Sequence, residues 1–89
     1  MTKVTIFTLN YCPFCHKAKD VLRKRNIPFE EIDVTVDEDT QSKVIADKYG
    51  IKGQVTFPQI IINDKRIGGY DNLIKLIEEN KLDKLLNED

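Results

Sequence analysis

Residues 3–15 read KVTIFTLNYCPFC, and this stretch predicts a buried strand that runs directly into a helix. Residues 3–9 are mostly apolar or β-branched, which favours a strand. Pro13 suits the first position of a helix, where a missing N–H leaves no hydrogen bond unmade. The following apolar residues recur at helical steps and predict a buried stripe of Cys15, Ala18, Val21 and Leu22. Cys12 therefore falls at the junction of strand and helix.

Turn signals and apolar spacing predict a second strand and a second helix in the middle of the chain. Asn26 and Pro28 end the first helix, and residues 29–36 form a strand with an exposed edge or face. Asp37 is placed to cap a helix that ends at Gly50. The first strand, helix and second strand form a right-handed parallel unit.

The carboxyl-terminal part predicts a hairpin and a last helix. Strands at residues 57–62 and around 66–67 flank a turn at 63–65, and they pair antiparallel. Asp71 is placed to cap the last helix, which residues 82–86 continue or extend. The order is β-α-β-α-β-β-α, so we expect an α/β fold in one domain spanning residues 1–89. Its four-stranded mixed sheet is flanked by three or more helices.

Composition narrows the class of protein. The chain has 89 residues, 14 Lys and Arg against 15 Asp and Glu, and a net charge of −1. A general nucleic-acid binder is normally clearly basic, so we expect no nucleic-acid partner. No apolar run approaches the ~20 residues of a membrane helix, and residues 1–7 do not look like a secretory signal. We therefore expect a monomeric cytoplasmic protein that does not bind membranes.

Charge is unevenly distributed along the sequence. Residues 1–26 contain six basic side chains against Asp20 alone, whereas residues 27–50 are acidic overall. Most of these residues are typical of solvated helix faces. The basic segment nevertheless surrounds both cysteines, where positive potential favours a thiolate and attracts anionic ligands.

Cys12 and Cys15 are separated by two residues at the predicted start of the helix. Cys12 falls at or next to the N-cap, where unpaired N–H groups and the helix dipole stabilise an anion. Cys15 lies one turn further in and should be less exposed. These positions predict Cys12 as the attacking nucleophile and Cys15 as the resolving thiol, in a pair that cycles between dithiol and disulfide.

Other interpretations of this cysteine pair fit less well. A structural disulfide closing so short a loop adds little stability, and it does not suit a cytosolic protein. Zinc needs about four ligands, and His16 is the only histidine, so no metal is expected. Cys12 to His16 also matches the haem-attachment pattern C-x-x-C-H, but haem attachment would require export. Inert buried cysteines are not expected at a junction of strand and helix.

Three separated motifs resemble the glutaredoxins, which have a thioredoxin-like fold. Residues 12–15, CPFC, are similar to the family's C-P-Y-C, with Phe14 in place of Tyr. Residues 56–59, TFPQ, resemble T-V-P-Q, with Phe57 in place of Val. Residues 68–73, GGYDNL, resemble G-G-x-D-D/N-L. Together these motifs extend the resemblance over nearly the whole chain.

The resemblance implies that glutathione binds beside the cysteines as a co-substrate. The segment from Thr56 to Pro58 would hold its peptide backbone, with a cis bond before Pro58. The residues expected at its γ-glutamyl end are Gly69, Tyr70 and Asp71. From the residues alone, Pro58 could instead start an edge strand, and Asp71 could serve only as a helix cap.

Two further positions belong to the expected glutathione site. The ring of Tyr11 is expected beside the bound tripeptide, although an exposed loop aromatic is the alternative. Gln54 stands where family members often have Arg, so it offers hydrogen bonds without charge. Many members also have a Lys where this chain has Leu9. These departures put the affinity for glutathione in question, rather than the thiol chemistry.

The resemblance implies a glutathione-dependent thiol–disulfide oxidoreductase of electron transport and cell redox homeostasis. Its partners would be glutathione and proteins that are glutathionylated or contain disulfides. One alternative is a glutaredoxin-like electron donor reduced by thioredoxin reductase, serving an enzyme such as ribonucleotide reductase. The other is a non-enzymatic protein that binds an iron–sulfur cluster through Cys12 and glutathione.

Overall fold

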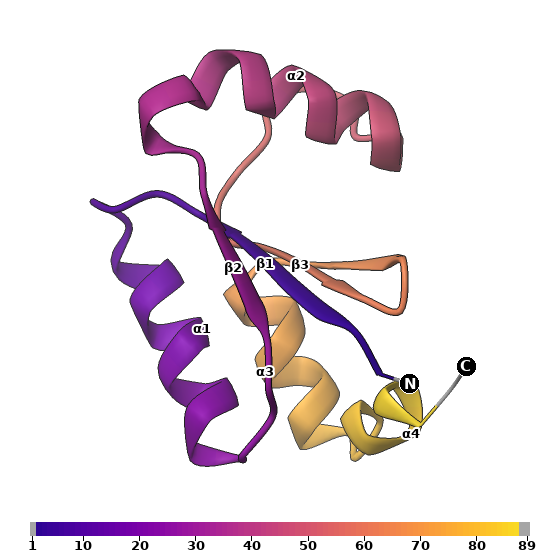
Figure 1. Cartoon of the computed structure of the whole chain (residues 1–89). Coiled ribbons are helices and arrows are strands. Elements are labelled where there is room, and N and C mark those ends of the chain that lie inside the picture. Colours follow the sequence, from indigo (N-terminus) through magenta and orange to yellow (C-terminus); the bar gives the residue numbers. More distant parts are fainter. Residues whose placement is uncertain (1, 88–89) are drawn as a thin grey trace.

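The computed structural model describes residues 2–87, which form four strands, four α-helices and one short 3-10 helix. The order β-α-β-α-β-β-α predicted from the sequence is confirmed, with the last helix divided in two (Figure 1). The elements are β1 (Val4–Thr8), α1 (Pro13–Lys24), β2 (Glu30–Asp33), η1 (Thr35–Asp37), α2 (Glu38–Tyr49), β3 (Gln59–Ile62), β4 (Lys65–Gly68), α3 (Tyr70–Glu78) and α4 (Leu82–Leu86).

The strands form one mixed sheet in the order β2-β1-β3-β4. β1 pairs with β2 in parallel, with Phe7 opposite Ile32, as expected for a β-α-β unit. β3 runs antiparallel to both β1 and β4, and its pairing with β4 is irregular between Ile60 and Ile61. Because β2 and β4 are the edges, β3 lies in the interior of the sheet.

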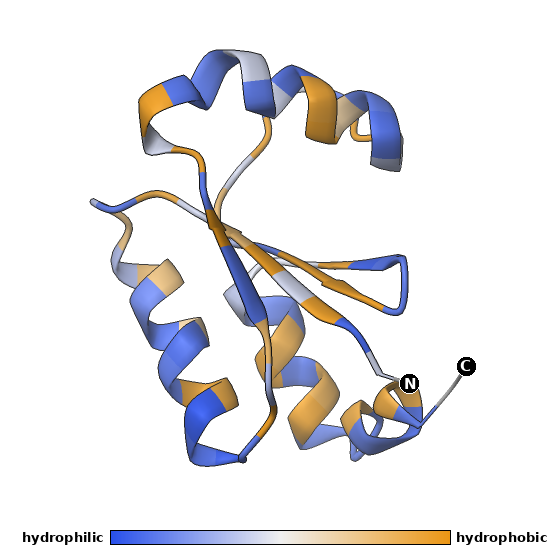
Figure 2. Ribbon diagram, in the orientation of Figure 1, coloured by the Kyte–Doolittle hydropathy of each residue, from blue (hydrophilic) through white to orange (hydrophobic). Residues whose placement is uncertain are grey.

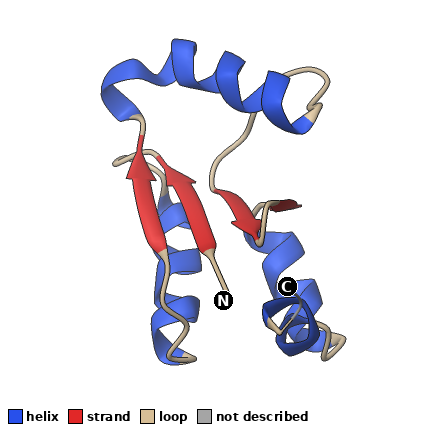
Figure 3. Ribbon diagram, turned by 45° about the vertical axis from the view of Figure 1, so that its right-hand side comes forward, coloured by secondary structure: helices blue, strands red, loops and turns tan. Residues whose placement is uncertain are grey.

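The main core lies between the sheet and α1, α3 and α4 (Figure 3). Alternate residues of β1 and β3 point into it because successive side chains of a strand face opposite sides. Its buried members are Val4, Ile6, Ala18, Leu22, Ile60, Ile62, Leu73 and Leu82. Figure 2 shows the hydrophobic residues of β1 and β3 running through the middle of the fold, with hydrophilic residues on much of α1. This packing fixes the start of α1 relative to the start of α3.

Helix α2 lies across the ends of β1 and β2, apart from α1 and α3 (Figures 1 and 3). It ends as predicted at Gly50, which takes a left-handed conformation with φ of 67°. Asp37 occupies the N-cap position, but its side chain does not bond the backbone there and instead accepts from Nε2 of Gln41. Ile45 is the one residue of α2 that is buried.

Strand β2 is shorter than predicted. Asp33 ends it, and Val36 lies in η1 with a fully exposed side chain rather than in the strand. The backbone N–H of Thr35 donates to Oδ1 of Asp33 over 2.9 Å, and this local bond turns the chain away from the sheet. β3 likewise begins at Gln59, two residues later than predicted.

No helix within residues 2–87 is long and apolar enough to cross a membrane.

Candidate active site

Cys12 is the N-cap residue of α1, as the sequence predicts. Its backbone is extended, and Sγ accepts a hydrogen bond from the backbone N–H of Cys15 over 3.1 Å. This bond satisfies one of the N–H groups that the first turn of a helix leaves unpaired. Sulfur at this position is therefore held by the helix start, which stabilises the thiolate form.

The two cysteines differ sharply in exposure. Both are free thiols, but Cys12 is half-buried whereas Cys15 is 0% exposed. Burial, reinforced by a hydrogen bond with Cys12, raises the pKa of Cys15 to about 12. Cys12 is thus the thiol that a substrate can reach, and Cys15 is protonated at neutral pH.

A loop carrying a cis peptide bond lies against Cys12. The bond between Phe57 and Pro58 is cis, as the family resemblance implies. The Cys12 thiol donates to the carbonyl oxygen of Phe57 over 3.5 Å. Pro58 is buried and precedes β3, an interior strand, so the alternative that it starts an edge strand is wrong.

A cavity of about 230 Å³ opens beside this loop, between it and the start of α3. It contains six of the predicted glutathione-site residues: Thr56, Phe57, Pro58, Gly69, Tyr70 and Asp71. Phe14, Arg66 and Asn72 complete the lining. The rings of Phe14 and Tyr70 lie 5.7 Å apart, so the first turn of α1 and the start of α3 share one wall. Phe57 connects the cavity to Cys12, because its carbonyl oxygen accepts the hydrogen bond from the Cys12 sulfur.

Asp71 lies on the first turn of α3 but does not cap it. The N-cap is Gly69, whose N–H donates to Oδ1 of Asn72 over 3.1 Å. The prediction that Asp71 caps this helix is therefore wrong, since Asn72 makes the capping bond instead. The exposed carboxylate of Asp71 lines the cavity and has no ion-pair partner among residues 2–87.

Tyr11 and Gln54 do not line this cavity. The Tyr11 side chain is 61% exposed, and its hydroxyl donates to Oε1 of Glu38 at the start of α2. That hydrogen bond raises the pKa of Tyr11 above its ordinary value. Gln54 lines a second hollow, of about 460 Å³, together with Glu38 and Asp39. The expected contacts of Tyr11 and Gln54 with glutathione therefore remain predictions.

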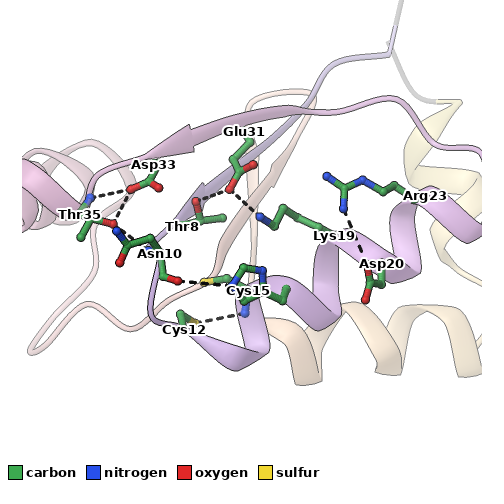
Figure 4. A network of polar contacts seen from close by, with 11 residues as sticks. Thr8, Asn10, Cys12, Cys15, Lys19, Asp20, Arg23, Glu31, Asp33 and Thr35 are labelled. Carbon is green, nitrogen blue, oxygen red and sulfur yellow. Dashed lines mark hydrogen bonds and ion pairs between the residues drawn. The ribbon is translucent and has the colours of Figure 1, made fainter.

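A partly buried polar cluster lies behind the cysteines, between α1 and the edge strand β2 (Figure 4). Nζ of Lys19 lies 2.8 Å from Oε2 of Glu31, and Oγ1 of Thr8 donates to the same oxygen over 2.7 Å. These two bonds hold the pKa of Glu31 below its ordinary value. Lys19 follows Cys15 by one helical turn, so the cluster fixes α1 against the sheet where the thiols are held.

Two features of the site were not identified from the sequence. Arg66 reaches the cavity from β4, and Phe14 contributes a ring from within the CPFC motif. The spacing of the hairpin could have placed Arg66 beside the TFPQ segment, although the direction of the Arg66 side chain depends on the irregular pairing of β3 with β4.

Among residues 2–87, His, Cys, Asp and Glu side chains do not come together in groups of three that could hold a metal ion.

Comparisons with known proteins agree with this geometry. The family model described as Glutaredoxin matches residues 4–67. Glutaredoxin 1 of Rickettsia bellii is 43% identical over 83 residues, covering 93% of this chain and 85% of that protein. The solution structure of a Brucella melitensis glutaredoxin superposes with a TM-score of 0.78 at 37% identity, covering 97% of this chain and 89% of that one. A buckwheat glutaredoxin–glutathione complex shares the fold, with a TM-score of 0.81 at 22% identity over 96% of this chain and 76% of that one.

Proposed function

The chain belongs to the glutaredoxin family of thiol–disulfide oxidoreductases, and from this premise we propose that glutathione is its co-substrate. The proposed activity is the reduction of glutathione mixed disulfides and of protein disulfides. Its partners are then glutathione and glutathionylated or disulfide-containing proteins. We propose that it acts as a single-domain monomer in the cytoplasm, where the glutathione pool is reducing.

The single observation that carries the proposal is the position of the Cys12 sulfur. It lies at a helix start, within 3.5 Å of the Phe57 carbonyl, beside a cavity whose lining combines peptide groups with a free carboxylate. Backbone groups of Phe57 suit the peptide part of glutathione. The start of α3 and Asp71 suit its γ-glutamyl end, because N–H groups bind a carboxylate and Asp binds an ammonium.

The reaction proceeds by two thiol–disulfide exchanges. The Cys12 thiolate attacks the glutathione sulfur of a mixed disulfide, and the target leaves as a thiolate that takes up a proton. A second glutathione, as thiolate, then attacks the sulfur of the glutathione bound to Cys12. This step releases oxidised glutathione and regenerates the Cys12 thiolate, so each target thiol that is released consumes one reduced glutathione.

Protein disulfides follow a branch that uses Cys15. Cys12 attacks one sulfur and forms a mixed disulfide with the protein, and the Cys15 thiolate then attacks Sγ of Cys12. The protein leaves as a dithiol, and Cys12 and Cys15 remain as a disulfide that two glutathiones reduce. This branch requires Cys15 to lose its proton, which its burial opposes.

A coupled turnover assay tests the proposal. The purified protein is given a glutathionylated peptide, glutathione, glutathione reductase and NADPH, and NADPH oxidation is followed. We expect turnover that saturates with the peptide. A parallel reaction with thioredoxin reductase in place of glutathione and its reductase should show little activity. Turnover supported only by thioredoxin reductase would contradict the proposal.

A further inference from the structure

Arg66 is fixed at the cavity by a relay of hydrogen bonds. Its Nε donates to Oε1 of Gln59 over 3.0 Å, and Nε2 of Gln59 donates to the carbonyl oxygen of Thr56 over 2.7 Å. Gln59 is 1% exposed, so its amide is a rigid link between β4 and the loop before Pro58. The relay uses the Nε–H group and places the guanidinium at the cavity wall. The remaining N–H groups of the guanidinium are therefore available to a ligand.

Arg66 and Asp71 line the same cavity with opposite charges, but they are not joined to each other. Within residues 2–87, the Arg66 side chain bonds Gln59, and no ion pair involves Asp71. Arg66 is also the one basic residue among the described residues that line the cavity. Two separated opposite charges complement a ligand group that carries both, and the α-amino-acid end of a γ-glutamyl residue is such a group.

Resting on the proposed function, we propose that Arg66 is a specificity-determining residue that binds the α-carboxylate of the γ-glutamyl group. Asp71 then takes the ammonium on the same carbon. A guanidinium presents paired N–H groups that match a carboxylate, so this contact adds to the backbone N–H groups of α3. Arg66 thus places the positive charge of the site at the γ-glutamyl end of the bound glutathione. Leu9 and Gln54, where family members often carry a cation, provide none.

The test compares two peptide substrates that differ in one carboxylate. One carries glutathione in disulfide linkage, and the other carries 4-aminobutyryl-Cys-Gly, which keeps the amino group and lacks the α-carboxylate. With Arg66→Gln, KM for the glutathionylated peptide should rise roughly tenfold at unchanged kcat. KM for the 4-aminobutyryl peptide should stay within about twofold of the unaltered protein, because no carboxylate is present to lose its partner.

Lys75→Gln is the matched control. Lys75 lies on α3 in a neighbouring hollow that Arg66 also borders, and it does not line the cavity. Its loss removes the same charge and should leave both KM values unchanged. Arg66→Met keeps the length of the stem and should reproduce the Arg66→Gln result. Thermal unfolding of each variant confirms that it is folded at the assay temperature.

The outcomes separate this inference from the proposed function. If the unaltered protein fails to turn over the glutathionylated peptide, the proposed function is wrong. If it turns over but Arg66→Gln leaves KM for that peptide unchanged, the inference alone is wrong. An equal rise of KM for both peptides also overturns it, because Arg66 would then act only through Gln59 on the loop.

Discussion

The backbone N–H of Cys15 donates to the sulfur of Cys12 over 3.1 Å, so the buried cysteine helps to hold the accessible one in place. The same residue contributes a thiol that is 0% exposed and whose pKa is raised to about 12. One turn of helix therefore gives its two sulfurs opposite properties. Cys12 is reachable and accepts a hydrogen bond, while Cys15 is enclosed and protonated.

Serine substitutions should separate the two roles. Cys15→Ser keeps the backbone N–H that bonds Cys12, so we expect the reduction of a glutathionylated peptide to continue at a rate within about threefold of the unaltered protein. Cys12→Ser removes the nucleophile and should abolish it. The glutathione-coupled assay measures both variants. Activity that persists in Cys12→Ser would show that the roles are assigned wrongly.

The raised pKa of Cys15 predicts a steep pH dependence for its attack on a mixed disulfide. Only the thiolate attacks. When Cys12 is held in a mixed disulfide it no longer acts on Cys15 as a thiolate, but burial, the largest cause of the raised pKa of Cys15, remains. Below that raised pKa the thiolate fraction rises about tenfold per pH unit. A fluorescent peptide trapped on Cys12 should therefore be released about tenfold faster for each unit between about pH 6 and about pH 9. Stopped-flow fluorescence measures this release, and Cys15→Ser, which cannot release the peptide, gives the baseline. A plateau below pH 9 would contradict the prediction.

Much of the fold could be predicted because its local signals agree with its packing. Pro13 suits the first position of α1, and Gly50 suits the left-handed conformation that ends α2. These preferences are local and do not depend on how the rest of the chain packs. Val36 shows the opposite case. Its β-branched side chain favours a strand, but Asp33 and Thr35 bond locally and turn the chain out of the sheet. A local hydrogen bond there outweighs a weak intrinsic preference.

Only the site residues that belong to a family motif could be predicted from the sequence. Seven residues of the TFPQ and GGYDNL segments meet in one cavity, yet they come from opposite ends of a hairpin. Arg66 was missed because its position depends on the buried amide of Gln59 and on the irregular pairing of β3 with β4. Asp71 was expected as the cap because it is the acidic residue near the helix start, but Asn72, at the third position of α3, is the residue whose Oδ1 accepts from the N-cap N–H of Gly69.

The pair formed by Lys19 and Glu31 should stabilise the fold in a pH-dependent way. Hydrogen bonds from Lys19 and then Thr8 lower the pKa of Glu31 in the folded chain. The stabilisation is therefore complete above the unfolded pKa, about 4.3, and is lost as pH falls through the lower folded value. Glu31→Gln should reduce the free energy of unfolding by about 1–2 kcal/mol at pH 7. The difference should shrink toward zero in strong acid.

Urea unfolding at neutral and at acid pH measures this effect. Glu30→Gln is the matched control, since it removes the same charge from the neighbouring position of β2, and Glu30 makes no ion pair among residues 2–87. Its effect should stay below about 0.5 kcal/mol. A loss for Glu31→Gln that persists unchanged in acid would mean that packing, rather than charge, accounts for it.

Gly68 should be the glycine least tolerant of substitution, because it faces the capping side chain of α3. Its φ is +117°, and a Cβ there would lie 2.6 Å from Oδ1 of Asn72, the atom that accepts from Gly69. Gly68→Ala should therefore cost about 2–3 kcal/mol of unfolding free energy, from backbone strain together with the displaced cap. Gly53→Ala separates these causes, since Gly53 also has a positive φ, +83°, but nothing within 4 Å of its Cβ position. It should cost only about 1 kcal/mol in urea unfolding. Equal costs for the two variants would show that the contact with Asn72 contributes nothing.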